Sequence, residues 1–319
     1  MKIISEDIFT VASCFKPAIS IGVGLTLAIG LTPSAEAASF ADFVFLVDES
    51  GSMYGEHAWL GQSIGDLESA LQGKGVGIGA EKNRYGLVGF GGNSYGTERS
   101  LSVGGDLFGN ASELTSATNS LVASGAFEDG YSAMDYALNN YSFRDDAAVN
   151  FVLITDEDRD IGANHVNFNS ILNGLQSKNA LLNVVVNHAM TDGNGQRAIG
   201  ADAQGNAFIA DGSGGFTTNS NTTVSSFSSF GTTKTDYVDL AWSTGNSTIS
   251  GAAWDLNVLR AGGQSAKSFT KAFADVKSTE ALKQTGNGNS TKVPEPTATL
   301  GLLGLAALGL CKRMVHQSI

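Results

Sequence analysis

Cysteine and histidine are scarce in this chain, which narrows the kinds of cross-link and metal site it can build. Only two cysteines occur among 319 residues, and both lie in the terminal segments, at Cys14 and Cys311. If those segments are removed, the remaining chain has no thiol and no disulfide. The four histidines show no zinc-like spacing, so a zinc site of the His/Cys type is not expected.

Basic side chains are also few. The 19 Lys and Arg residues stand against 31 Asp and Glu residues, which gives a net charge of −12. An acidic chain is repelled by nucleic acid and by anionic membrane surfaces, so we expect neither as a partner. Charged residues make up only 16% of the chain, whereas glycine takes 40 positions. This loop-rich composition is typical of a surface or secreted protein, and the length suits one large or two small domains with processing segments.

The first 37 residues have the features of a secretory signal peptide. A mostly apolar run from Ala18 to Leu31 follows Lys2 and Lys16 and precedes the small-x-small cleavage signal Ala35-Glu36-Ala37. We expect cleavage after Ala37. Residues 38–284 are then the main domain.

The other end of the chain has the composition of a sorting signal. Pro294-Glu295-Pro296 is followed by an apolar run, Thr297 to Leu310, and by Lys312-Arg313. The run is shorter than the ~20 residues of a comfortable membrane span. This order resembles the PEP-CTERM signal of Gram-negative bacteria (residues 294–319), which implies recognition by an exosortase-type protease. A plain C-terminal membrane anchor is the alternative, and the polar residues 285–293 predict a flexible linker.

A buried strand leads directly into oxygen-bearing side chains near the start of the main domain. The apolar run Phe43 to Val47 is followed by Asp48, Ser50 and Ser52. Such a run predicts a parallel strand covered on both faces, whose end lies at the edge where open α/β sheets bind ligands. One acid and two hydroxyls at this spacing suit a small hard cation such as Mg²⁺. An ordinary Ser/Gly turn is the alternative.

The pattern Asp-x-Ser-x-Ser resembles the metal-ion-dependent adhesion site (MIDAS) of von Willebrand factor A (VWA) and integrin I-type domains. The resemblance covers about residues 40 to 280. It implies a doubly wound, mostly parallel, six-stranded Rossmann-like α/β sheet in the order 3-2-1-4-5-6, with helices on both faces. In that order the first and fourth strands are neighbours, so their ends lie together.

Two further loops match this family. The strand Val149 to Ile154 ends in Thr155-Asp156, which is similar to the third motif of the family. Most VWA domains have a Thr ligand in the loop that here contains Glu128. The local form Glu-x-Gly-aromatic-x-Ala-Met looks like the integrin β I-like variant, in which a Glu takes that place. The resemblance therefore implies five metal ligands: Asp48, Ser50, Ser52, Glu128 and Asp156.

Two points of this resemblance stay open. Glu128 could instead be an acid that complements the dipole at a helix N-terminus. Integrin β domains also carry two acids just after Asp-x-Ser-x-Ser that bind an adjacent cation. Here Gly55 and Glu56 stand in those places, which puts a second cation site in doubt.

Periodicity and turn residues predict the remaining elements. Helices are expected over Leu60–Leu71, from a capping box at Asn110 and Glu113 to Val122, from about 130 to Leu138, after Asn167 over Phe168–Leu175, and around Phe269–Val276. Further strands are expected at Tyr85–Phe90, Thr97–Val103, Leu181–Asn187 and Gly251–Leu256, whereas Tyr237–Trp242 fits a strand or a helix.

The Gly/Ser/Thr/Asn-rich residues 191–235 predict an insertion with one hairpin, in which Ile199–Asp202 pairs with Ala207–Ala210. The acids Asp192, Asp202 and Asp211 in this segment fit ordinary turns better than calcium loops. Gly92-Asn93-Ser94-Tyr95-Gly96 has the nucleophile-elbow pattern of α/β-hydrolases. A strand-like segment follows it where the elbow needs a helix, so we expect a hairpin turn.

These features favour a secreted or cell-surface adhesion module over an enzyme. The site would hold Mg²⁺, or Mn²⁺ or Ca²⁺, and bind an acidic group of a protein or an acidic polymer. A metal-dependent hydrolase is one alternative, although Ser50 stands where phosphatases of the haloacid dehalogenase type need a second Asp. A structural matrix protein whose site is never loaded is the other.

Overall fold

The computed structural model describes residues 39–92, 97–162 and 165–286. The expected signal peptide (1–37) and sorting signal (294–319) lie outside these residues, as do most of the linker (285–293) and of the Gly92–Gly96 turn. Among the described helices, none has the length and apolar character needed to cross a membrane.

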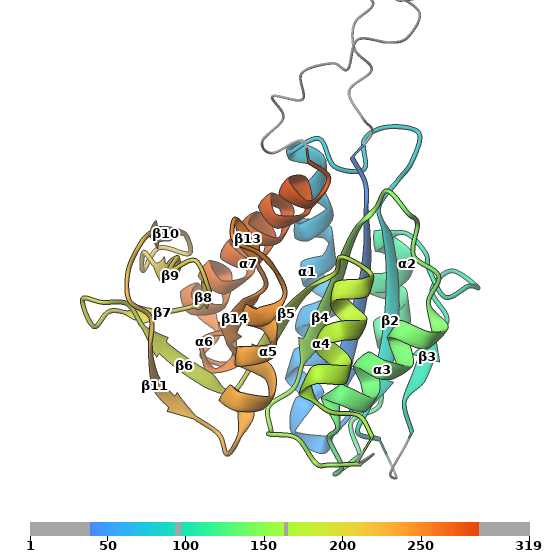
Figure 1. Ribbon diagram of the computed structural model, residues 1–319, viewed down its shortest axis with the longest axis horizontal. Coiled ribbons are helices and arrows are strands. Elements are labelled where there is room, and N and C mark those ends of the chain that lie inside the picture. The colour runs from blue at the N-terminus through green and yellow to red at the C-terminus, as the bar shows by residue number, and fades with distance from the viewer. Residues whose placement is uncertain (1–38, 93–96, 163–164, 287–319) are drawn as a thin grey trace, which may run out of the picture. The chain divides into compact units, whose positions relative to one another are not determined.

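A nine-stranded mixed sheet runs through the domain, in the order β10-β9-β8-β14-β5-β4-β1-β2-β3 (Figure 1). Its strands are β1 (Ala41–Asp48), β2 (Arg84–Phe90), β3 (Arg99–Leu101), β4 (Ala148–Ile154), β5 (Leu181–Val186), β8 (Gly200–Asp202), β9 (Ala207–Ala210), β10 (Phe216–Asn219) and β14 (Ala252–Asp255). The five strands β2, β1, β4, β5 and β14 are parallel. With antiparallel β3 they give the predicted order 3-2-1-4-5-6, so the doubly wound α/β fold is confirmed.

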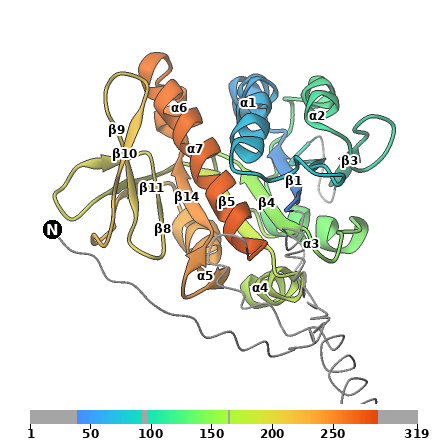
Figure 2. The same ribbon diagram turned by 90° about the horizontal axis from the view of Figure 1, so that it is seen from above.

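Helices cover both faces of this sheet (Figure 2). One face carries α1 (Tyr54–Gly73), α2 (Ala111–Ala117), α6 (Leu256–Arg260) and α7 (Gly263–Gln284), and the other carries α3 (Gly130–Asn140), α4 (Phe168–Ser177) and α5 (Asp239–Ser243). Because successive side chains of a strand point to opposite faces, Phe43 and Phe45 of β1 enter the core under α1 and α7, whereas Val44 and Leu46 enter the core under α3 and α4. All eight residues of β1 are buried, as the apolar run predicts.

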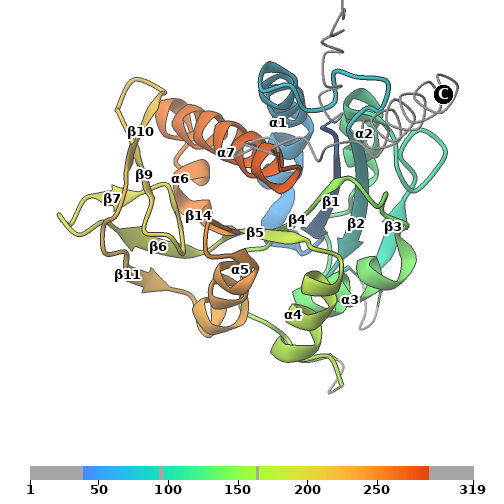
Figure 3. The same ribbon diagram turned by 45° about the horizontal axis from the view of Figure 1, so that its top comes forward.

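The sheet is wider than the six strands expected, because the segment predicted as an insertion contributes three of the nine. The predicted hairpin is confirmed by the pairing of β8 with β9, and β10 extends it. Two more strands of the same segment pair with β6, which ends where the segment begins, in a separate three-stranded sheet beside β14 (Figure 3). The three-stranded sheet consists of β6 (His188–Thr191), β7 (Arg197–Ala198) and β11 (Ser225–Ser229). A separate two-stranded ribbon follows, formed by β12 (Gly245–Asn246) and β13 (Ile249–Ser250).

Three Asp-centred turns connect the strands of this segment. Asp192, Asp202 and Asp211 each accept a hydrogen bond from the backbone N–H four residues on, at 2.8 to 2.9 Å. In each turn the residue three positions after the Asp is a glycine with positive φ, a conformation that side chains disfavour. All three acids therefore lie in hydrogen-bonded turns. The repeated Asp-x-x-Gly spacing was the sequence signal for the additional strands.

Smaller differences concern element ends. The capping box of Asn110 and Glu113 is present, but α2 ends at Ala117, not Val122. A 3₁₀ turn, Thr118–Ser120, follows, and the N–H of Val122 donates to the carboxylate of Glu49 at 2.8 Å instead of continuing the helix. The segment that sequence left undecided is helical, with a π-turn at Lys234–Val238 leading into α5.

A buried polar network fixes α7 on the sheet. The Nζ of Lys277, which is fully buried, donates to the carboxylate of Glu280 and to the side-chain oxygen of Asn150 in β4, both at 2.7 Å. Glu280 also accepts from Asn183 in β5 at 2.9 Å. Burial lowers the pKa of Lys277 and raises the pKa of Glu280, and their mutual attraction opposes both shifts. Each of the two charges is therefore tolerated in the core only because the other lies beside it.

Replacing Lys277 with Met tests this dependence. The variant leaves Glu280 buried without its cation, so we expect a loss of about 3–5 kcal/mol in the free energy of unfolding. The matched control is Lys74→Met, because Lys74 pairs with Asp275 on the surface of the same helix at 2.8 Å. That exposed pair should contribute at most about 1 kcal/mol. Similar losses in urea unfolding of the two variants would contradict the network's role.

Candidate metal site

The carboxyl ends of β1 and β4 lie side by side and bring two predicted ligands close together. Val47 pairs with Ile154 in the parallel register, so Asp48 and Thr155 follow at the same level of the sheet. The Oγ1 of Thr155 donates to Oδ2 of Asp48 at 2.8 Å. The predicted meeting of the first and fourth strands at this edge is confirmed.

The two serines and Asp156 complete a chain of oxygens around this edge. Oδ1 of Asp48 accepts the backbone N–H of Ser50 at 2.7 Å, which turns the loop back on its strand. The Oγ atoms of Ser50 and Ser52 lie 3.0 Å apart, and Ser52 donates to Oδ1 of Asp156 at 3.0 Å. Adjacent ligands of an octahedral Mg²⁺ with metal–oxygen distances of about 2.1 Å are also separated by about 3.0 Å. The separations among the two serine hydroxyls and Oδ1 of Asp156 are therefore compatible with adjacent ligands of one small cation.

Glu128 lies next to this group of oxygens and is only 3% exposed. A Cβ added at Gly91 would come within 3.0 Å of Oδ1 of Asp48 and 3.4 Å of Cγ of Glu128, so the missing side chain of Gly91 leaves room for both acids. The acid that caps α3 is the next residue, Asp129, which accepts the N–H groups of Tyr131 and Ser132. The helix-terminal role considered for Glu128 thus belongs to its neighbour.

Most buried acids of the domain face a basic side chain. Seven such acids form ion pairs with Arg or Lys: Asp42, Glu49, Glu56, Asp129, Asp156, Asp255 and Glu280. Within the described residues, Asp48 and Glu128 form no ion pair. Burial without a basic partner therefore disfavours the ionised form of both carboxylates. A metal ion would bind that ionised form and stabilise it.

The pKa values of both acids reflect this missing positive charge. Burial, with a further contribution from Asp156, raises the pKa of Asp48 to about 7. Burial and then the charge of Asp48 raise the pKa of Glu128 to about 8, with smaller contributions from Glu157 and Asp160. In the part of the chain described, no three His, Cys, Asp or Glu side chains converge closely enough to hold a metal by themselves. A cation here would thus rely on the serine hydroxyls as well as the acids.

Three residues at this edge were not among the predicted ligands. Thr155 holds Asp48, as described above, and Nε2 of His57 donates to the carbonyl oxygen of Asp48 at 2.7 Å. Arg260 of α6 donates to Oδ2 of Asp156 at 3.0 Å and to Oε1 of Glu56 at 2.6 Å. Thr155 stands within the matched Thr-Asp motif, whereas no sequence signal links Arg260 to residues so far away in the chain. The single acid left for a second cation, Glu56, is thus already ion-paired.

The loop that contains Ser124 and Gly125 packs against residues next to the candidate metal site. The buried carboxylate of Glu49 binds Arg99 at 2.5 Å, and its backbone carbonyl accepts the N–H groups of Ser124 and Gly125 at 3.0 Å. A Cβ at Gly125 would lie 1.5 Å from the carbonyl oxygen of Gly91, which leaves no room for a side chain. The loop that contains Gly125 therefore packs closely against the backbone of Gly91.

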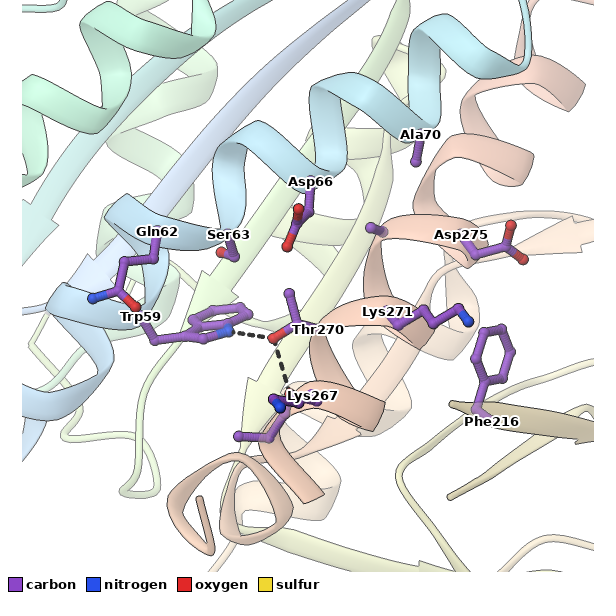
Figure 4. Close-up of a pocket in the computed structure, with 12 residues that line it drawn as sticks. Trp59, Gln62, Ser63, Asp66, Ala70, Phe216, Lys267, Thr270, Lys271 and Asp275 are labelled. Atoms are coloured by element: carbon purple, nitrogen blue, oxygen red, sulfur yellow. Dashed lines mark hydrogen bonds between the residues drawn. The ribbon is translucent and has the colours of Figure 1, made fainter. Parts of the chain in front are cut away.

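A groove of about 870 Å³ lies elsewhere, between α1 and α7 (Figure 4). Trp59 forms part of its wall and donates from Nε1 to Oγ1 of Thr270 at 2.9 Å. Phe216 of β10 and the lysines Lys267 and Lys271 also line it. None of the five predicted ligands does, so the groove is separate from the candidate metal site.

Comparison with known proteins yields matches among solved structures alone, since no family description and no curated protein matches the chain. An aerotolerance-related membrane protein from Bacteroides fragilis is 14% identical, with a TM-score of 0.42, over 76% of this chain and 99% of the other. Proximal thread matrix protein 1 from the mussel byssus is 12% identical, with a TM-score of 0.36, over 47% of this chain and 36% of its own.

A von Willebrand factor type A structure from Catenulispora acidiphila is 14% identical, with a TM-score of 0.33, over 46% of this chain and 33% of the other. The chain therefore spans about a third of the length of the mussel and Catenulispora chains. At these values the fold of the present chain rests on its own strand order.

The raised pKa values of the two unpaired acids predict how stability depends on pH. The ordinary values are 3.8 for Asp48 and 4.5 for Glu128, against about 7 and about 8 in the folded chain. The folded state therefore binds more protons than the unfolded state within this window, and stability falls as pH rises through it.

We expect the melting temperature of the metal-free chain to fall between about pH 5 and pH 8. Asp48→Asn, which cannot ionise, should show a smaller fall. Differential scanning calorimetry of both proteins in EDTA measures this, and the difference between the two proteins reports Asp48 together with its effect on the pKa of Glu128. Equal pH slopes would contradict the assignment.

Proposed function

We propose that this chain is an exported binding module of the VWA type, which uses one divalent cation to hold an acidic group of a protein partner. The observation that carries the proposal is the convergence, at one sheet edge, of two buried and unpaired acids with serine hydroxyls. The acids are Asp48 and Glu128, and the hydroxyls are those of Ser50 and Ser52. These hard oxygen donors fit Mg²⁺, with Mn²⁺ and Ca²⁺ as alternatives.

A bound cation would supply the positive charge that this edge lacks and an open position for a carboxylate from outside. The chain's own residues prepare the site for it. Thr155 and the N–H of Ser50 hold both oxygens of Asp48 in place, and Ser52 orients Asp156. Without the cation, Asp48 and Glu128 offer no positive charge to a partner carboxylate. Binding of an acidic partner should therefore require the metal.

Exposed apolar side chains around this edge favour a protein partner over an acidic polysaccharide. Tyr54, the first residue of α1, follows the Asp-x-Ser-x-Ser loop and is 77% exposed. Ile161 is 65% exposed and follows Asp160, whose N–H donates to the carbonyl oxygen of Glu128 at 2.8 Å. Large exposed apolar side chains around a polar centre are typical of protein interfaces.

We also propose binding, not catalysis, as the role of the site. The side chains at this edge are arranged to hold one cation, and Arg260 already neutralises Asp156 in part. A structural matrix role with an unloaded site predicts that substitution of Asp48 changes no binding. The present proposal predicts the opposite.

Metal binding is tested first on the purified domain. We expect Mg²⁺ at 100 times its dissociation constant to add about 2.7 kcal/mol to the free energy of unfolding, because it binds the folded state alone. Asp48→Asn should abolish this gain, and Glu128→Gln should weaken binding in calorimetric titration. If Mg²⁺, Mn²⁺ and Ca²⁺ all leave the wild-type melting curve unmoved, the proposal is wrong.

Partner binding is tested with surface proteins extracted from the producing cells. The immobilised domain should capture its partner in Mg²⁺ and release it in EDTA, and Asp48→Asn should capture none. Ile161→Asp should reduce capture at least tenfold, or ~1.4 kcal/mol, without changing the Mg²⁺ dissociation constant. The matched control is Ile78→Asp, since Ile78 is 62% exposed and lies near Ser39, at the opposite end of β1. Equal capture by the two Ile variants would exclude the apolar rim as part of the interface.

A further inference from the structure

Arg260, the last residue of α6, places its guanidinium among three oxygens beside the candidate metal site. Its Nε donates to Oε1 of Glu56 at 2.6 Å, and its Nη2 donates to Oδ2 of Asp156 at 3.0 Å and to the carbonyl oxygen of Ser52 at 3.2 Å. Nη2 also lies 3.6 Å from Sδ of Met53. The two carboxylates come from the start of α1 and the end of β4, so only the folded chain brings them to one cation.

Both of these acids are buried, and they share a single basic partner. Glu56 and Asp156 form ion pairs with the same guanidinium and, within the described residues, with no other basic side chain. Elsewhere the arrangement differs. Asp42, for example, is held by both Arg84 and Arg144. The carboxylates of Glu56 and Asp156 that surround Arg260, here called the cradle, therefore carry two negative charges against the single positive charge of the guanidinium.

The oxygens that face the guanidinium are also the kind that a divalent ion binds. Two carboxylates and a backbone carbonyl are hard ligands of the type that hold Ca²⁺ and Mn²⁺. Arginine is not deprotonated in proteins, so its charge stays in place at every physiological pH. The cradle is thus filled by a cation that no chelator can remove.

We propose that Arg260 is an internal cation that takes the place of a second divalent ion and limits this edge of the sheet to one exchangeable metal. The inference rests on the proposed function for the first metal. Asp156 divides its two oxygens between the two positive charges. Oδ2 faces Arg260, and Oδ1 accepts from Ser52 on the side of the candidate site. Arg260 is therefore a positioning residue for Asp156 as well as its counter-ion.

The experiment counts bound Mn²⁺ by calorimetric titration and by electron paramagnetic resonance of the free ion. We expect one ion in the wild-type domain, two in Arg260→Gln, none in Asp48→Asn and one in the double variant. The second ion in Arg260→Gln should also raise the melting temperature of that variant more than Mn²⁺ raises that of the wild type. If Arg260→Gln binds no more Mn²⁺ ions than the wild type does, the inference is overturned.

Arg197→Gln is the matched control. Arg197 binds the buried Asp255 at 2.6 Å, so its removal exposes one unpaired acid without a second carboxylate beside it. This variant should bind no additional ion. An additional ion here would show that any unpaired buried acid attracts Mn²⁺ and would overturn the specific role of Arg260.

Two outcomes separate this inference from the proposed function. If the wild type binds no ion and Arg260→Gln gains one, the inference stands and the proposed metal site fails. If Arg260→Gln does not fold in EDTA, it is refolded in millimolar Mn²⁺. Recovery of the native circular dichroism spectrum supports the inference, and failure to recover it contradicts the inference.

Discussion

The burial of negative charge at the end of β1 is the constraint on which the candidate site depends. A carboxylate taken out of water needs a positive charge or several hydrogen bonds nearby, or it takes up a proton instead. Asp48 has the N–H of Ser50 and the hydroxyl of Thr155, but no basic partner among the described residues. In the metal-free site the pKa of Asp48 is therefore raised to about 7, and a bound divalent cation would favour the charged form.

The surrounding fold keeps these charges together at close range. β1 is covered on both faces, so its end cannot move toward water without disturbing two cores. Gly91 allows Asp48 and Glu128 to approach, and Gly125 lets a further loop pack against the same backbone. Asp129 caps α3 and is held by Arg159 at 2.6 Å, which anchors the residue after Glu128. Repulsion between the acids is thus opposed by packing from several directions.

Charge is divided sharply within this small region. Asp156 and Glu56 face Arg260, whereas Asp48 accepts from the hydroxyl of Thr155 and its charge raises the pKa of Glu128. A fixed cation and an exchangeable one would therefore serve different acids of a single edge. This division explains how several carboxylates can converge without the domain needing more than one metal ion for its charge balance.

The apolar run of the sequence by itself predicted the buried first strand, and the resemblance to VWA domains implied the strand order that places the ends of β1 and β4 side by side. The sequence also located the hairpin of β8 and β9. Tertiary structure alone decided that Arg260 reaches Asp156 and Glu56, since residues separated by about a hundred positions or more show no pattern that links them. It likewise decided that Asp129, not Glu128, caps α3. Two adjacent acids look alike in sequence, and only the path of the backbone determines which one turns toward the helix.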